Sequence, residues 1–331
     1  MSQKPLYWST LKLYEQCPQQ CLWKRGYPGI DCGGGVGKSK PVPQRKSEHH
    51  LVMGIVIGDT LEHLYNDELW RDPSTLRERL IELTKLTFES ELAKPYRHID
   101  WNETSREEML TICLDGVLDY LRTMKHNKLL GEYARSEVDL RTHVDKWNPI
   151  GGRADLIIRR TDSGTAIYDF KNSKYAGKYT DPDQLRFYAL CFYLAYHKMP
   201  DKLGFIYMRF PWEQPPEGYD AETWTGVVDV PFTEEDIKGL AQRAKEAGKG
   251  LWKKKFEPTP VPKMCKLCDY ESCCDARQAQ RAENARGRRR KKPDVIPEGT
   301  EGAVDLGFGG SLPASPAVQE IMTEDPHAKD N

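Results

Sequence analysis

The first third of the chain places apolar residues three or four positions apart, which is the spacing of amphipathic helices. The clearest example is the stretch 104–126, and the same period predicts helices over residues 52–70 and 75–95. A shorter helix is predicted over residues 7–23, with an interruption at Pro18 because the residue before a proline avoids helical geometry. In the stretch 104–126, the residues that repeat at this spacing are Leu110, Leu114, Val117, Leu118 and Leu121.

The pattern changes beyond residue 130, where apolar and polar residues alternate with the period of strands. Gly151 and Gly152 predict a turn before one strand, and Asp162-Ser163-Gly164 predicts a hairpin after it. The expected order is three strands, a helix, a strand, one further strand and a long helix. These elements span residues 133–144, 153–160, 165–171, 183–197, 202–210, 223–230 and 233–255.

Composition narrows the class of protein. Of the 331 residues, 38% are hydrophobic and 30% are charged, and no apolar stretch is long enough to span a membrane. No apolar leader follows Met1, and the nine cysteines are an odd number. We therefore expect a cytoplasmic protein in a reducing compartment, with no membrane association, rather than a secreted scaffold of disulfides.

Charge is unevenly distributed although the formal net charge is only −1. Residues 293–331 carry one lysine against eight acidic residues, so the rest of the chain is mildly basic. Beyond about Ala279 the chain is rich in Arg and then in Gly, Pro, Asp and Glu, a composition that predicts disorder. A basic run in this tail either contacts phosphates or is simply solvated, and the sequence favours neither alternative. The run consists of Arg286, Arg288, Arg289, Arg290, Lys291 and Lys292.

The stretch 33–39, Gly-Gly-Gly-Val-Gly-Lys-Ser, mimics a phosphate-binding loop. The spacing G-x₄-G-K-S requires a glycine at position 32, where Cys32 stands. Pro41 and Pro43 also prevent a long helix directly after the loop. We therefore expect a flexible loop and no nucleotide cofactor.

Four charged side chains are candidates for a metal site. Alternate residues of a strand share a face, so Asp169 and Lys171 point the same way. Asp155 lies on the preceding strand and Glu137 on the strand before that, so three carboxylates and a lysine can converge at one edge. Mg²⁺ prefers carboxylate oxygens, and such a cation polarises a phosphoryl oxygen and lowers the pKa of bound water. The alternative is a solvated polar face of a strand.

The helix after the third strand adds Gln184 and Tyr188, which are four residues apart and share a face. In the alternative interpretation Gln184 lies on the surface and Tyr188 packs in the core. Taken in order, these residues resemble the motifs of the PD-(D/E)XK nuclease superfamily, and more narrowly those of its RecB-like branch. The matching motifs are Glu137, Gly152-x-x-Asp155, Asp169-Phe170-Lys171 and Gln184-x-x-x-Tyr188.

The resemblance covers about residues 6–276. It implies an α/β fold with a restriction-endonuclease-like core, in which a central mixed sheet is flanked by helices. It further implies that Lys171 activates water and that Gln184 and Tyr188 support the site or contact DNA. The ligands that it implies for Mg²⁺ or Mn²⁺ are Glu137, Asp155, Asp169 and the carbonyl of Phe170.

One departure concerns a metal-binding histidine that RecB-like members carry in the pattern G-x-x-x-H-x-x-L-E. The stretch 54–62 fits this pattern, but Gly58 occupies the histidine position. His63 lies five residues further on, which is a different face of the helix. The site would then use fewer protein ligands, or Asp59 would contribute one.

Three cysteines near the end of the predicted domain, Cys265, Cys268 and Cys274, have the spacing C-x₂-C-x₅-C. With a fourth ligand from elsewhere in the chain, such thiolates suit structural Zn²⁺ or a [4Fe–4S] cluster. The resemblance to iron–sulfur RecB-like nucleases implies the [4Fe–4S] cluster, with zinc as the alternative. It favours Cys17 over Cys21 as the fourth ligand and Cys274 over Cys273. Such a cluster would clasp the N-terminal helix to the C-terminal segment.

These features predict a RecB-like nuclease domain over residues 1–278 and a disordered tail over 279–331. The domain would contain a helical insertion at about 52–126, a catalytic core at about 130–230, and the last helix with the cysteine cluster at 233–276. We expect a metal-dependent DNA exonuclease that acts on single strands or ends in recombination, repair or replication, with a separate helicase or recombination protein as partner. The alternative is a catalytically weak nuclease fold that serves as a DNA-binding subunit.

Overall fold

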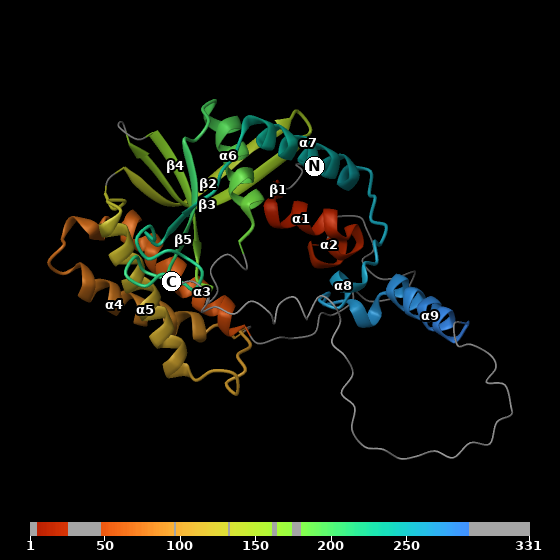
Figure 1. Cartoon of the computed structure of the whole chain (residues 1–331), viewed down its shortest axis with the longest axis horizontal. Helices are drawn as coiled ribbons and strands as arrows, with labels where there is room; N and C mark the ends of the chain where they lie inside the picture. The colour runs from red at the N-terminus through yellow and green to blue at the C-terminus, as the bar shows by residue number, and fades with distance from the viewer. Residues whose placement is uncertain are drawn as a thin grey trace, which may run out of the picture. The chain divides into compact units, whose positions relative to one another are not determined.

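The computed structural model describes residues 5–25, 48–95, 97–131, 133–160, 164–173 and 180–290. Its centre is a six-stranded mixed sheet with helices on both faces (Figure 1). The predicted α/β architecture, a mixed sheet flanked by helices, is therefore confirmed. The strands are β1 (Leu6–Tyr7), β2 (Ala134–Asp145), β3 (Asn148–Arg160), β4 (Gly164–Lys171), β5 (Lys202–Tyr207) and β6 (Val227–Asp229).

Strand β3 organises the sheet because it pairs with three other strands. β2 runs antiparallel along one edge of β3, while β4 and the short parallel strand β1 pair with different parts of the other edge. β4 and β5 are parallel, so they need a crossover connection, which is helix α6 (Pro182–Tyr196). β6 then pairs antiparallel with β5. The crossover brings the first turn of α6 back to the sheet after the end of β4.

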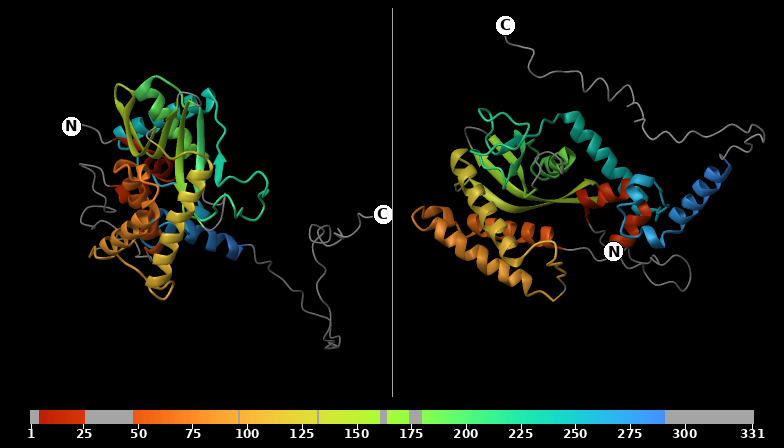
Figure 2. Two further views of the ribbon diagram at one scale, coloured as in Figure 1. Left: turned by 90° about the vertical axis from the view of Figure 1, so that its left-hand side faces the viewer. Right: turned by 60° about the horizontal axis from the view of Figure 1, so that its bottom comes forward.

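Two groups of helices cover the two faces of the sheet, as the right-hand view of Figure 2 shows. Helices α1, α6 and α7 pack on one face, and helices α3, α4 and α5 pack on the other. Their bounds are α1 (Trp8–Gln16), α3 (His49–Asn66), α4 (Leu76–Leu92), α5 (Arg106–His126) and α7 (Glu234–Trp252).

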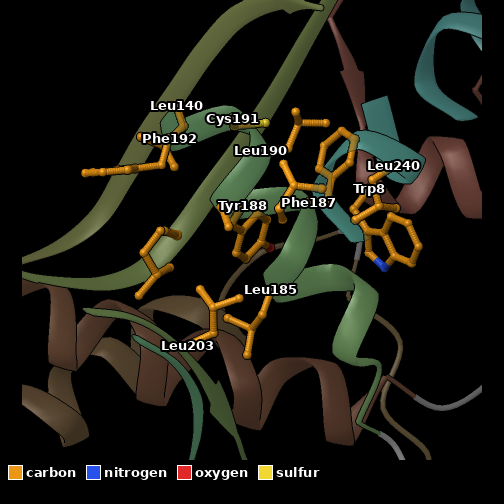
Figure 3. Close-up of a cluster of buried hydrophobic side chains, with 14 of the residues drawn as sticks. Trp8, Leu140, Leu185, Phe187, Tyr188, Leu190, Cys191, Phe192, Leu203 and Leu240 are labelled. Carbon is orange, nitrogen blue, oxygen red and sulfur yellow. The ribbon is translucent and has the colours of Figure 1, made fainter. Parts of the chain in front are cut away.

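Each face of the sheet buries its own apolar core. Figure 3 shows the first core, to which α6 contributes Leu185 and Phe187 and α7 contributes Leu240. The second core contains Ile57 of α3 and Tyr120 of α5, both fully buried. Because burying one large apolar side chain stabilises the folded state by about 1.5–3 kcal/mol, these cores hold α6 and α3 firmly against the sheet.

The predicted helices and strands agree with the observed ones in kind and order, and their ends shift by a few residues. The sequence pattern does not predict β1, since two residues are too few to show a period. The helix predicted over residues 7–23 is divided into α1 and α2 (Pro18–Arg25) at the expected proline. Shorter elements are η1 (Leu69–Arg71), α8 (Pro262–Cys265) and η2 (Glu271–Cys273).

The turn predicted at Gly151 and Gly152 is wrong, because β3 continues through both residues. The second glycine instead allows close packing: a β-carbon at Gly152 would lie 2.8 Å from Cδ1 of Tyr188. The turn before β3 lies at Lys146 and Trp147, and the carboxylate of Asp145 accepts hydrogen bonds from the backbone N–H groups of Trp147 and Asn148. Glycine inside a strand can thus mark a close approach rather than a turn.

The C-terminal region also differs from the prediction of disorder beyond residue 279. Helix α9 runs over Asp275–Arg290. Its sequence is rich in Ala and Arg, which are good helix formers, so a segment too polar to form a core can still form a helix. The remainder of the predicted tail, residues 291–331, lies outside the described residues, as do Cys32 and the glycine-rich stretch 33–39.

The chain divides into two compact units, Met1–Glu283 and Asn284–Asn331, and every described strand belongs to the first. In the described ranges, no helix is both long enough and apolar enough to cross a membrane.

Candidate functional site

Strands β2, β3 and β4 and helix α6 bring the predicted active-site side chains together. β4 places two charged residues on the face that α6 covers, and the first turns of α6 supply two polar residues. β2 and β3 each add a carboxylate. The residues are Glu137, Asp155, Asp169, Lys171, Gln184 and Tyr188, and their catalytic roles stay predictions.

Gln184 links the two strand residues of β4 to helix α6. Its Nε2 donates hydrogen bonds to Oδ1 of Asp169, at 2.7 Å, and to the hydroxyl of Tyr188, at 3.0 Å. Its Oε1 accepts a hydrogen bond from Nζ of Lys171, at 3.2 Å. Lys171 Nζ also lies 2.5 Å from Oδ2 of Asp169 as an ion pair. One amide therefore fixes the positions of both the carboxylate and the ammonium group.

Asp155 joins β3 to the backbone of β4. Its Oδ2 accepts a hydrogen bond from the N–H of Phe170, at 2.7 Å, and its own carbonyl accepts one from the hydroxyl of Ser136, at 2.8 Å. The Phe170 ring turns to the opposite face, where it meets Tyr120 edge-on with centroids 5.0 Å apart. Asp155 thereby lies against β4, near enough to Asp169 for the charge of Asp169 to help raise its pKa.

Glu137 has an unusual backbone conformation within β2. Its φ of 53° lies in the left-handed region, which a non-glycine residue seldom occupies. The neighbouring pairs Ser136↔Leu156 and Val138↔Ala154 are in regular register, whereas Glu137 and Asp155 between them are not paired. Such a conformation costs on the order of 1–3 kcal/mol and persists only where the surrounding structure imposes it.

The pair of strands also changes face at this point. Ala134 and Leu140 are six residues apart on β2, so in a regular strand they would face the same side. Ala134 instead belongs to the core under α3 and α5, and Leu140 to the core under α6. On β3, Ala154 and Leu156 divide between the two cores in the same way. The irregular position therefore coincides with two of the predicted metal ligands, and no feature of the sequence predicts it.

Burial raises the pKa of all three carboxyl groups. It raises the pKa of Asp155 well above its ordinary value, and the charges of Asp169 and Glu137 act in the same direction. Burial also raises the pKa of Asp169 against the opposing charge of Lys171, and that of Glu137 against the opposing charge of Arg153. Carboxylates this close to one another in a buried site are costly to ionise together, so a divalent cation among them would stabilise their charged forms.

Helix α3 contributes an acidic rim beside Glu137. Arg153 forms an ion pair with Glu137 and lies 3.6 Å from the carboxylate of Glu62. Asp59, one turn earlier, has a pKa raised first by burial and then by the charge of Glu62. The sequence pattern singles out Asp155 but not Arg153, although Arg153 stands only two residues before it on the same strand.

The position of the absent histidine, Gly58, lies in α3 next to this rim. A β-carbon at Gly58 would have no atom within 4 Å, so the helix leaves space there. His63 does not take its place, because its Nδ1 pairs with the carboxylate of Asp67 at 2.7 Å on an exposed part of the helix.

Four cysteines from distant parts of the sequence line one small pocket. Cys17 follows α1, and Cys265, Cys268 and Cys274 belong to the C-terminal segment. Burial raises the pKa of the thiols of Cys265 and Cys268, and the thiol of Cys17 is among the neighbours that raise both further. The four predicted ligands are therefore neighbours, which suits a centre held by four thiolates.

Cys21 and Cys273, the neighbouring cysteines that the resemblance does not favour as ligands, lie differently. Cys21 is fully buried, with its sulfur 3.9 Å from the carbonyl oxygen of Thr10. Cys273 is exposed, and its thiol donates a hydrogen bond to the carbonyl of Tyr270 at 3.4 Å. Neither cysteine lines the pocket.

Hydrogen bonds also join the two chain segments beside this pocket. The Tyr14 hydroxyl donates to the carbonyl of Lys255, and the Thr259 hydroxyl donates to the carbonyl of Gln16, both at 2.8 Å. The end of α1 and the segment after α7 are therefore in contact without any contribution from the thiols.

The chemistry of the two groups of side chains suits two kinds of metal. Carboxylate oxygens suit Mg²⁺ or Mn²⁺, and four thiolates suit an iron–sulfur cluster or Zn²⁺. Within the described ranges, however, no group of three or more His, Cys, Asp or Glu side chains is already arranged to hold a metal ion. Metal binding at either place stays a prediction.

The predicted basic run falls at the end of the described chain. Arg286 is exposed on α9, and Arg288, Arg289 and Arg290 continue that helix. Lys291 and Lys292 lie outside the described residues. A contact of this run with nucleic acid stays a prediction.

Comparisons with known proteins were informative at the level of the family. The sequence model of the PD-(D/E)XK nuclease superfamily matches residues 8–275. No curated protein matches the chain significantly. Eight chains of solved structures match, among them one titled "Crystal structure of SSO0001". That chain is 18% identical, the match covers 69% of this chain and 96% of that one, and the TM-score is 0.32.

Proposed function

The chain belongs to the PD-(D/E)XK nuclease superfamily, and from this premise we propose that it is a metal-dependent nuclease that hydrolyses phosphodiester bonds in DNA. One observation carries the proposal: Gln184 holds Asp169 and Lys171 in a single hydrogen-bonded group beside Asp155. A carboxylate and an ammonium group fixed by one amide are an arrangement suited to phosphoryl chemistry, which depends on positioning and charge stabilisation.

Each side chain would have a distinct task in this reaction. Bound Mg²⁺ or Mn²⁺ would polarise the phosphoryl oxygen and lower the pKa of an attacking water. The residues that would hold it are Glu137, Asp155, Asp169 and the carbonyl of Phe170. Lys171, with only 17% of its side chain exposed, would orient the water and stabilise the negative charge that develops on the phosphate. Gln184 would keep Lys171 in position, and Tyr188 would hold Gln184.

Within the family, we propose a RecB-like iron–sulfur nuclease that acts on single strands or ends of DNA. The four cysteines around one pocket support this narrower assignment, because they belong to both ends of the matched region. The tight hydrogen-bonded site supports an active hydrolase. A catalytically weak DNA-binding subunit is the second candidate, and Gly58 at the usual histidine position favours it.

A cleavage assay separates these two candidates. Labelled single-stranded and duplex DNA should be degraded in the presence of Mg²⁺ or Mn²⁺ and left intact in EDTA. Lys171→Ala should reduce cleavage by roughly 10²–10³-fold, the usual loss when one transition-state contact is removed. The matched control is Lys238→Ala, since Lys238 is an exposed lysine of α7 whose ion pairs are with Glu234 and Glu235 of its own helix.

DNA binding without cleavage by the wild-type protein would favour the catalytically weak subunit. Undiminished cleavage by the Lys171→Ala protein would reject the proposed active site. Product lengths from end-labelled strands would distinguish an exonuclease, which releases short products from the start, from an endonuclease.

A further inference from the structure

Two tryptophans far apart in the sequence line one apolar pocket at the far end of the β2–β3 hairpin. Trp147 lies in the hairpin turn and Trp252 ends α7, and their side chains are among the most exposed large apolar groups, at 69% and 71%. The pocket between them has a volume of about 250 Å³. An isolated exposed apolar residue needs no explanation, but two indole rings around one pocket form a specific feature.

The hairpin turn is rigidly placed. The Asp145 carboxylate accepts hydrogen bonds from the N–H of Trp147, at 2.9 Å, and from the N–H and side-chain amide of Asn148, at 3.0 and 2.9 Å. Asn148 is buried against Gly248 of α7, where a β-carbon would lie only 2.2 Å from its Oδ1. Trp252 lies one helical turn beyond that contact, so both tryptophans extend from backbone that these contacts hold in place.

The rim of the pocket is basic. Lys249 and Lys253 line it, and neither forms an ion pair with any residue that the structure describes. Lys146 lies over the ring of Trp147, with Nζ 4.9 Å from the ring centroid. Asp145 is the acidic residue of the lining, and its carboxylate is already engaged by the hydrogen bonds of the turn. The pocket thus combines aromatic walls with positive charge available to a ligand.

We propose that this pocket binds a base of single-stranded DNA, which stacks on Trp147 and Trp252 while Lys249 and Lys253 contact the neighbouring phosphates. Aromatic walls accept any base because every base has a flat π-face, and lysines suit the backbone regardless of sequence. A duplex keeps its bases stacked within itself, so the pocket favours a single strand. The positive rim argues for a nucleic acid over an apolar segment of protein, which would leave the lysines without counter-charges.

This inference rests on the proposed function and makes its substrate class more specific. Asn148 at the pocket and Asp155 at the carboxylate site are seven positions apart on β3, which is roughly 23 Å along an extended strand. The pocket would therefore hold the strand several nucleotides away from the bond that is cleaved. A single strand held there would be presented to the active site at a defined distance.

Binding measured without cleavage tests the pocket independently of catalysis. Fluorescence anisotropy in EDTA would compare full-length protein with a labelled thymidine homopolymer and with an abasic strand of equal length. Trp147→Ala and Trp252→Ala should each weaken binding of the thymidine strand by about 5- to 140-fold, the loss expected for one stacked base. Neither change should alter binding of the abasic strand. Trp252→Phe should retain most of the affinity, because the ring can still stack.

The matched control is Trp101→Ala, since Trp101 is another exposed tryptophan, at 45%, in the loop between α4 and α5. Lys249→Gln together with Lys253→Gln should reduce the salt dependence of binding for both strands. Equal affinity of wild type, Trp147→Ala and Trp252→Ala for the thymidine strand would overturn the proposal, and so would equal loss on the abasic strand. A dimer in sedimentation that Trp252→Ala dissociates would instead assign the pocket to a second copy. Each of these results leaves the metal-dependent cleavage assay, and hence the proposed nuclease, unaffected.

Discussion

The carboxylate site and the cysteine pocket are assembled in different ways. The carboxylate site draws its residues from the stretch 137–188, where strand register and one helix place each side chain. The cysteine pocket requires Cys17 to meet Cys265, which lies 248 positions later in the chain. The first site is thus a local product of the sheet, whereas the second joins the two ends of the domain. We therefore expect metal loss to affect chemistry at the first site and folding at the second.

The largest expected effect is on folding. Protein purified without oxygen should be brown and contain about four iron atoms per chain, as a [4Fe–4S] cluster requires. Cys17→Ala should lose this iron and destabilise the whole domain. A cross-link that closes a loop of 248 residues stabilises the folded state by roughly 5 kcal/mol, so a loss of that order is expected in chemical denaturation.

The matched control is Cys21→Ala, because Cys21 is buried nearby but does not line the pocket. It should keep the iron, at the cost of a small cavity. Zinc without iron in the wild-type protein would preserve the clasp and remove the link to iron–sulfur nucleases. Folded, anaerobically prepared protein with neither metal would falsify the clasp.

Arg243 connects the cysteine pocket to the carboxylate site, and its substitution has the next largest expected effect. Its guanidinium contacts both carboxylate oxygens of Glu15, at 2.8 Å, and one of Asp183, at 2.7 Å. Glu15 lies two residues before Cys17, and Asp183 directly precedes Gln184. Arg243→Gln should destabilise the domain by about 1–2 kcal/mol, a value that allows for its partial exposure. It should also lower cleavage several-fold, because the first turn of α6 would lose an anchor.

Arg141→Gln is the control, since Arg141 is an exposed arginine whose ion pair lies within its own strand. If Arg243→Gln reduces stability but leaves cleavage unchanged, the carboxylate site and the cysteine pocket belong to the same fold but are not coupled through Arg243. If it also displaces iron, the connection extends to the cysteine pocket. Visible absorption and cleavage measured on the same preparation distinguish these results.

The relations within a single strand or helix of the carboxylate site can be predicted from the sequence. Asp169 and Lys171 share a face because side chains alternate along a strand, and Gln184 and Tyr188 share one because they are four apart on a helix. Both relations depend on a single element, so periodicity is sufficient. The hydrogen bonds by which the Gln184 amide joins α6 to β4 become possible because the chain brings α6 back to the end of β4.

The features that the sequence does not predict depend mostly on contacts between different helices and strands. Gly152 looks like a turn residue in the sequence, and only the proximity of Tyr188 explains it as a strand residue. The left-handed conformation of Glu137 coincides with the change of face along β2 and β3, which no local pattern records. For α9, the composition is too polar to predict a core, but helix propensity is a separate property, and this segment is a helix.

Mg²⁺ should stabilise the protein through the carboxylate site and not through the cysteine pocket. The pH dependence of this stabilisation distinguishes the two sites. Asp155 and Asp169 have raised pKa values in the folded protein, whereas an unfolded aspartate has a pKa of about 3.9. At pH values between the unfolded and the folded pKa, the folded state binds more protons than the unfolded state does. The stability of the metal-free protein therefore falls as the pH rises through this window. Mg²⁺ competes with those protons, so it should stabilise the protein above the window and have little effect below it.

At ten times its dissociation constant, Mg²⁺ should add about 1.4 kcal/mol near pH 8 and almost nothing near pH 4. Thermal unfolding with and without Mg²⁺ measures the difference. Asp169→Asn should abolish the effect, while Asp139→Asn, an exposed position on β2, should retain it. A response that is the same at both pH values, or that survives Asp169→Asn, would show that Mg²⁺ binds elsewhere.

The smallest expected effect concerns Gly58, where the carboxylate site departs from the family pattern. Gly58→Ala should stabilise the domain by about 0.5–1 kcal/mol, because alanine loses less backbone entropy than glycine in a helix and the position has free space. Gly54→Ala is a matched control, since Gly54 also lies in α3 with no atom within 4 Å of a β-carbon. The two alanine variants should therefore gain similar stability in chemical denaturation.

Gly58→His should behave differently from both alanine variants. Its imidazole would be added to the rim that Asp59 and Glu62 form on α3, so it should strengthen the response to Mn²⁺ in thermal unfolding and lower the Mn²⁺ concentration needed for cleavage. Asp169→Asn in the same chain should cancel the gain, because the added ligand would serve the same ion. If Gly58→His gains stability without any change in its response to Mn²⁺, then α3 lies outside the metal site and the carboxylates of β2, β3 and β4 act without it.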